Sequence, residues 1–167
     1  MNSTTQRAAL PSLQPQSPSN ILDAVDRTFD RTDPVEIVPW LDPLVDELGY
    51  PVGDPYVETF WLPVLGPTAT WLLRRLVDGL HREPEGYSVD MVDLARCLGL
   101  SHSPGRHGPF ARALHRCTMF GASQQVSMTP VPVHAVRRTM PRVARRHLDR
   151  LPASLRALHE AWPATRS

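Results

Sequence analysis

The sequence predicts a mostly α-helical α+β domain with one small β-hairpin, and three observations support this. Apolar residues recur at helical spacing in several segments of the middle of the chain. Two later segments, GASQQVSM and VPVHAVRR, alternate like strands across a turn at Thr129-Pro130. With 167 residues, 41% of them hydrophobic, the chain is long enough for one packed domain with extensions.

The central elements follow one another in a recognisable order. A helix is predicted from Pro67 onward, and a short strand at residues 87–89 follows the turn REPEG. A second helix, MVDLARCLGL, is capped by Ser88 or Asp90. A third, PFARALHRCTMF, ends at Gly121 and leads into the hairpin. Helix, strand, helix, turn, helix and hairpin is the order of a winged helix-turn-helix.

Four parts are expected along the chain. Residues 1–19, rich in Ser, Gln, Pro and Thr, are predicted to be a disordered tail. Residues 20–65 form an acidic helical extension that is a candidate for dimerisation, with helices at ILDAVDRTF and after Asp42-Pro43 and Asp54-Pro55. Residues 66–138 hold the winged helix-turn-helix, and residues 139–167 hold basic C-terminal helices that begin at Pro141 and Pro152.

The net charge of +1 conceals a division between two parts of the chain. Residues 1–60 hold three arginines and ten acidic residues, a net charge of −7. Residues 61–167 hold fifteen arginines and seven acidic residues, a net charge of +8. Between residues 96 and 150, ten arginines accompany the single acid Asp149. This clustering predicts a polyanionic partner for the basic part.

Other classes of protein are not indicated. The N-terminus lacks a signal-peptide pattern, and Pro63 and Pro67 interrupt the longest apolar stretch, FWLPVLGPTATWLL. We therefore expect a cytoplasmic protein associated with the nucleoid. Two cysteines, Cys97 and Cys117, indicate free thiols. Because no phosphate-binding glycine loop and no nucleophile–histidine–acid set stands out, we expect neither an enzyme nor a cofactor.

The third predicted helix, residues 109–119, has the two sides that a recognition helix needs. Phe110, Leu114 and Cys117 would seat it, while the opposite side would enter the major groove of DNA. An arginine that pairs with guanine there discriminates by about 1–3 kcal/mol. The predicted groove contacts are Arg106, His107, Arg112, His115 and Arg116. The alternative is a solvent-exposed side with spare charge.

Further side chains are predicted to bind DNA phosphates. Ser103 lies in the turn SHSPGRHG near a helix start, and Arg137 and Arg138 end the second hairpin strand. A helix over residues 142–151 would place a basic arc opposite an apolar one. The members of that basic arc are Arg142, Arg145, Arg146 and Arg150. The arc could contact the DNA backbone, an acidic protein surface, or the acidic segment of the same chain.

A zinc site is a weaker interpretation of the same region. Two cysteines and three histidines fall within 21 residues: Cys97, His102, His107, His115 and Cys117. Their spacing matches no zinc finger, and both cysteines fall on apolar helix faces, where a free cysteine behaves as a small hydrophobe. We therefore expect no metal.

Several of these segments carry a resemblance to known proteins. Residues 66–138 resemble bacterial winged-helix DNA-binding domains. The segment FWLPVLGPTATWLLRRL is similar to the opening of the N-terminal winged-helix domain of DnaD-type replication initiation proteins, which implies self-association through residues 55–80. The pattern GPTATWLLRRL…VDLARCLGL…GRHGPFARAL…VRR…LP also resembles small actinobacterial proteins. No separate ligand-binding domain is evident, so the resemblance implies no small-molecule sensing.

Taken together, these patterns predict a sequence-specific, double-stranded DNA-binding protein, a transcriptional regulator or a DNA-associated accessory factor. A homodimer is expected, since one winged helix buries little DNA surface. The alternative is a protein–protein adaptor whose winged helix binds an acidic partner in a transcription or phage-related assembly.

Overall fold

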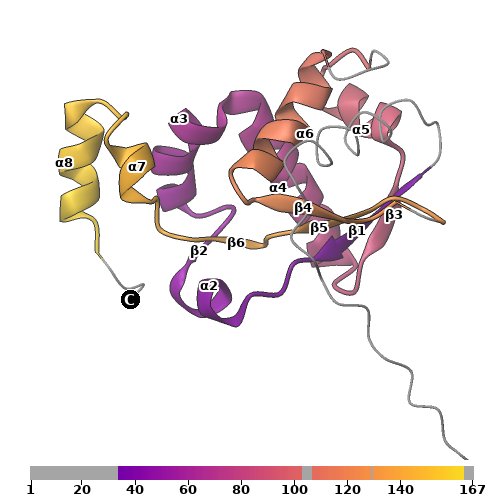
Figure 1. Ribbon diagram of the computed structural model, residues 1–167, viewed down its shortest axis with the longest axis horizontal. Helices are drawn as coiled ribbons and strands as arrows, with labels where there is room; N and C mark the ends of the chain where they lie inside the picture. The colour runs from indigo at the N-terminus through magenta and orange to yellow at the C-terminus, as the bar shows by residue number, and fades with distance from the viewer. Residues whose placement is uncertain (1–33, 103–106, 129, 164–167) are drawn as a thin grey trace, which may run out of the picture.

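The computed structural model describes residues 34–102, 107–128 and 130–163, which form helices packed with a small mixed sheet (Figure 1). The predicted α+β class is confirmed. The predicted disordered tail over residues 1–19 and the predicted helix ILDAVDRTF lie outside the described residues.

Three helices form a layer on one side of the sheet: α4 (Pro67–Arg82), α5 (Met91–Cys97) and α6 (Pro109–Met119) (Figure 1). Each begins as the sequence predicts. Pro67 opens α4, and the Asp90 side chain caps α5 by accepting hydrogen bonds from the backbone N–H groups of Val92 and Asp93. The apolar positions of α4 are buried as expected: Ala69, Leu72, Leu73, Leu76 and Leu80.

A glycine inside α4 has a packing reason. A Cβ at Gly79 would overlap the ring of Tyr87, whose hydroxyl donates to the Leu76 carbonyl at 2.9 Å. Tyr87 belongs to β3 (Tyr87–Val89), the strand that follows α4. Gly79 therefore lets the sheet approach α4 closely enough for this aromatic ring to pack against the helix.

The four-stranded sheet has the order β3-β1-β5-β4. The hairpin strands β4 (Ser123–Ser127) and β5 (Val133–Val136) are antiparallel, as the alternating pattern predicts. Strand β1 (Val35–Pro39) lies between β5 and β3, parallel to the first and antiparallel to the second. The segment 20–65, expected to be a helical extension, thus contributes a central strand, because Val35 and Ile37 are buried in the core.

The rest of that segment includes a short helix and a short strand. Helix α2 (Pro43–Leu48) begins at the Asp42 cap and ends at Gly49, both as predicted. Strand β2 (Tyr50–Pro51) then pairs with β6 (Thr139–Met140) in a second, two-stranded sheet.

The segment after Asp54-Pro55 forms a continuous helical run that contains an irregularity. A π-helical turn, η1 (Val57–Trp61), leads into α3 (Leu62–Leu65). The Leu62 N–H donates to Val57, five residues back. Because Pro63 has no N–H and its ring obstructs a regular turn, a widened turn before it is the expected accommodation.

The C-terminal part differs from its prediction in one helix. Helix α8 (Ala153–Ala161) forms as expected, but α7 (Arg145–Leu148) covers only a part of the helix expected over residues 142–151. The Tyr56 hydroxyl attaches this region to the rest of the molecule: it accepts from the Val143 N–H at 2.8 Å and lies 2.8 Å from the His159 Nε2. Burial raises the pKa of Tyr56 to about 12, so the hydroxyl keeps its proton.

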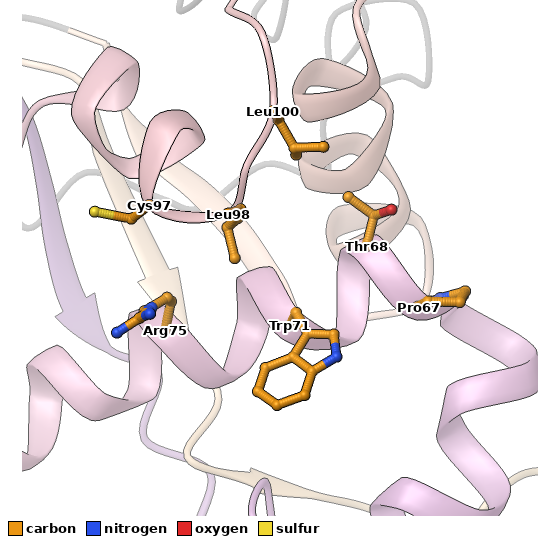
Figure 2. A pocket seen from close by; sticks show the side chains of 7 residues that line it. All are labelled: Pro67, Thr68, Trp71, Arg75, Cys97, Leu98 and Leu100. Atoms are coloured by element: carbon orange, nitrogen blue, oxygen red, sulfur yellow. The ribbon is translucent and has the colours of Figure 1, made fainter.

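A groove lies where α4 and the end of α5 meet (Figure 2). Its volume is about 320 Å³, and we call it the α4–α5 groove. It is lined by Pro67, Thr68, Trp71, Arg75, Cys97, Leu98 and Leu100. Trp71 is 58% exposed there, although most of the α4 face turned to the sheet is buried.

As for membranes, each helix of the described residues is too short or too polar to cross one.

Candidate nucleic-acid interface

Helix α6 presents the two sides expected of it. Phe110, Leu114 and Cys117 are at most 1% exposed, which seats the helix against the core. On its other side Arg112 is exposed, and its Nη1 donates to the His107 carbonyl at 2.8 Å. This bond holds the guanidinium near the start of α6 and leaves its other N–H groups available for a ligand.

The two histidines predicted for the groove differ in exposure. His107 is exposed, whereas His115 is half-buried and its Nδ1 has no hydrogen-bond partner among the described residues. The other predicted residues near the helix start, Ser103 and Arg106, lie outside the described residues.

Arg116 does not extend from α6 as a free side chain. Its Nε and Nη2 donate to the carbonyls of Leu65 and Val64, both at 2.6 Å. These carbonyls end α3, where a helix leaves its last acceptors without partners and carries partial negative charge. Arg116 therefore caps α3 in this conformation, although the residue is exposed, and its contact with a DNA groove stays a prediction.

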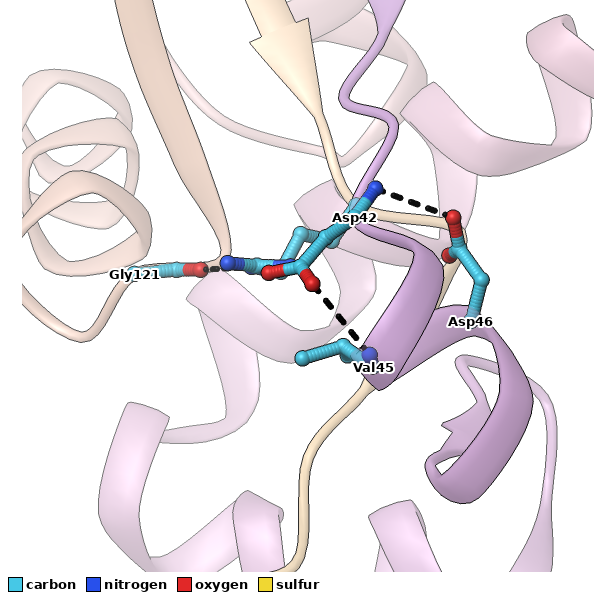
Figure 3. Close-up of polar contacts among 5 residues, drawn as sticks. Asp42, Val45, Asp46 and Gly121 are labelled. Carbon is cyan, nitrogen blue, oxygen red and sulfur yellow. Dashed lines mark hydrogen bonds and ion pairs between the residues drawn. The ribbon is translucent and has the colours of Figure 1, made fainter.

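Arg137, predicted to bind phosphate, is held by three groups of its own chain. Its Nη1 forms an ion pair with Asp42 Oδ2 at 2.9 Å, and its Nε donates to the Gly121 carbonyl at 2.8 Å (Figure 3). The guanidinium also lies 3.8 Å from the centre of the Trp40 ring. Its side chain is 12% exposed, so little of it can reach DNA.

The Arg137 bond has an electrostatic consequence for its partner. The hydrogen bond from the guanidinium, together with one from the Val45 N–H, lowers the pKa of Asp42 below its ordinary value of 3.8. Asp42 therefore stays ionised at neutral pH while it caps α2.

Arg142, predicted to bind phosphate, is also held by groups of its own chain. Residue 142 precedes α7, so it does not share a helical arc with the arginines that follow. Its Nη2 donates to the His159 carbonyl in the last turn of α8 at 2.8 Å, and its Nη1 lies 3.4 Å from the Tyr50 hydroxyl.

Arg138, the neighbour of Arg137, is half-buried, and its carbonyl accepts from the Val52 N–H.

The remaining predicted phosphate contacts do face solvent. Arg145 and Arg146 on α7 are exposed, and so is Arg150 just after it. His147 lies between these arginines, and partial burial, followed by the charges of Arg146 and Arg150, lowers its pKa. The lowered pKa favours a neutral imidazole at pH 7.

The zinc interpretation gains no support from the geometry. Within residues 34–102, 107–128 and 130–163, no three metal-ligating side chains come together. Cys97 is exposed at the groove, contrary to the expected apolar position, whereas Cys117 is buried. Burial raises the pKa of the Cys117 thiol to about 12, so it is unreactive at neutral pH.

Comparisons of this chain with protein-family models, with curated proteins and with solved structures gave no match.

Proposed function

We propose that this protein binds double-stranded DNA through a winged helix-turn-helix, with α6 as the recognition helix, and that it acts as a binding protein and not as an enzyme. The observation that carries the proposal is α6 itself. One side of α6 is buried in the core, and the opposite side holds an exposed arginine, Arg112, whose only bond among the described residues is to a backbone carbonyl. An arginine so placed keeps donors free for a guanine edge.

The order of elements supports the same proposal. Helix α4, strand β3, helices α5 and α6, and the hairpin β4–β5 follow one another as in a winged helix. Strand β1 is an addition, because it separates β3 from the hairpin in the sheet. The hairpin β4–β5 would be the wing.

The exposed arginines of α7 supply a second contact in this proposal. In Figure 1, α7 and α6 both lie on the helical side of the strands, with α3 between them. A duplex that runs along this side could therefore meet both. Arg145, Arg146 and Arg150 would then neutralise phosphates without reading bases.

The test is duplex binding measured over a range of salt concentrations. With a preferred sequence selected from a random pool, Arg112→Ala should cost about 1–3 kcal/mol and reduce site preference. The double variant Arg145→Ala/Arg146→Ala should weaken all sequences alike and reduce the salt slope by about 1.8, since each phosphate contact contributes about 0.9.

The matched control is Arg82→Ala, which removes one exposed arginine at the far end of α4. It should leave site preference unchanged. Unaltered site preference in Arg112→Ala would contradict the assignment of α6 as the recognition helix.

One observation favours a second candidate, a protein–protein adaptor of the same fold. Helix α2 exposes leucines to solvent, and the α4–α5 groove is apolar, so the molecule has surfaces suited to a protein partner. An adaptor would show little binding to random duplex at low salt, whereas the DNA-binding proposal requires measurable binding there.

A further inference from the structure

The outward side of α2 is an exposed apolar surface. Leu41, Leu44 and Leu48 are 68%, 66% and 62% exposed, and α2 buries none of its residues. Leu44 and Leu48, four residues apart, lie on one side of α2, and Leu41 immediately precedes the Asp42 cap; we call these three leucines the leucine face of α2. Exposed Glu47, three residues after Leu44, flanks it.

This exposure is not a sign of a loosely attached helix. The Asp42 carboxylate caps α2 by accepting from the Val45 N–H (Figure 3) and is fixed by Arg137. The Gly49 N–H closes the helix by donating to the Val45 carbonyl at 2.8 Å. Strand β2 follows at once and pairs with β6. The leucine face is therefore held in one orientation, which reduces the entropy cost of binding a partner.

The α4–α5 groove offers a complementary surface. Trp71, Leu98 and Leu100 give it apolar walls, and Arg75 adds a cation (Figure 2). Its volume of about 320 Å³ is at the lower end of the range for small-molecule clefts, about 300–1,000 Å³, so it has room for side chains of a partner and not for a whole helix. The exposed leucines on and just before a short helix, with a flanking carboxylate, match these apolar walls and this cation.

The α2 helix cannot reach the groove of its own molecule. Figure 1 shows α2 on the opposite side of the strands from α4 and α5. Its two ends are fixed by Asp42 and β2, as described. The α2 helix of another molecule has no such restriction.

We propose that the leucine face of α2 in one copy of this chain docks into the α4–α5 groove of a second copy, with Glu47 next to Arg75. If each copy docks its leucine face into the groove of the other, the pair is a closed two-fold dimer. If the docking runs in one direction only, the contact is heterologous and extends from copy to copy into a ring or a chain. The contact involves neither α6 nor α7, so it is independent of the proposed function.

Reciprocal charge reversal tests the pairing. Glu47→Arg and Arg75→Glu should each abolish self-association in sedimentation velocity, because each places like charges at the contact. A mixture of the two variants should associate again, since one copy then offers an arginine on α2 and the other a glutamate in the groove. Matched controls, Glu85→Arg and Arg82→Glu, reverse exposed charges elsewhere and should associate as the wild type does.

The native thiols supply a second measurement. Cys97 lines the groove, whereas Cys117 is buried, so a thiol reagent labels Cys97 first. At a concentration where nine-tenths of the chains are associated, labelling should slow about tenfold relative to dilute protein. In Leu44→Asp, whose change is on an exposed position, the rate should not depend on concentration.

Each result bears on the proposal directly. A wild-type protein that stays monomeric at millimolar concentration overturns it, and so does a labelling rate that is independent of concentration. If both charge reversals dissociate the protein but their mixture fails to associate, the Glu47–Arg75 pairing is wrong. Because no DNA is present, failure here leaves the proposed function untouched.

Discussion

The segment from His134 to Arg142 and the segment from Arg145 to Arg150 adjoin in the sequence, but their polar side chains have opposite environments. In the first, Arg137 and Arg142 bond to carbonyls, a carboxylate and aromatic rings of their own chain. In the second, all three arginines are exposed. This difference shows that a count of arginines overstates the positive charge available to a partner, because some guanidinium groups donate their hydrogen bonds to carbonyls at helix ends and in loops of the same chain.

The two segments also differ in their histidines, and this gives the largest expected effect. His134 is fully buried, neither ring nitrogen has a hydrogen-bond partner among the described residues, and burial lowers its pKa to about 4. The folded protein therefore holds this residue neutral, whereas the unfolded chain binds a proton below about pH 6.5. The contribution of His134 to the free energy of unfolding is fully present above about pH 6.5. It falls by about 1.4 kcal/mol per pH unit as the pH drops toward 4.

Urea unfolding of the wild type and of His134→Leu at pH 7, 6, 5 and 4 checks this. The variant should lose the part of the acid dependence that belongs to this histidine, about 3 kcal/mol over the whole interval. Parallel curves for the two proteins would show that His134 is not held neutral.

Arg137→Ala should give the next largest effect. It leaves Asp42 without its ion pair and removes a hydrogen bond and a ring contact, so we expect a loss of about 2 kcal/mol in the free energy of unfolding. Arg145→Ala, which removes the same side chain from an exposed position of α7, should change it by less than about 0.5 kcal/mol. Equal losses in the free energy of unfolding for the two variants would contradict the inferred difference between the two segments.

Arg116→Ala extends the comparison to α6. It removes two donors from the end of α3, and we expect a loss of about 1–2 kcal/mol in the free energy of unfolding. The salt slope of DNA binding should stay unchanged, because this arginine neutralises no phosphate. A slope reduced by about 0.9 would instead show that Arg116 leaves α3 and binds DNA.

The sequence predicts the parts of this fold that depend on local signals. The starts of α2, α4 and α5 follow from an acidic cap or a proline at the first turn, and the buried side of α6 follows from its apolar spacing. Those signals act within a few residues. The exposure of Arg112 could be predicted for the same reason.

The contacts that the sequence does not predict join residues that are distant in the chain. Arg116 donates to Leu65 and Val64, which precede it by 51 and 52 positions in the sequence. Arg137 pairs with the carboxylate of Asp42, 95 positions before it. No local pattern distinguishes these arginines from Arg145. Strand β1 and its central position in the sheet are not predicted either, although its residues VEIVP are typical of a strand. The cap and proline signals around α2 favour helices throughout that segment.

The central position of β1 has a consequence for how the chain folds. One neighbour, β3, is about 50 residues away in sequence, and the other, β5, is about 100 residues away. During synthesis β1 emerges first and must wait for nearly the whole domain before its parallel pairing can form. A fragment that begins at Gly66 would keep every element of the proposed winged helix but leave β3 and β5 with open edges. Such a fragment should aggregate and not fold, so the first residues of the described chain are indispensable to the architecture.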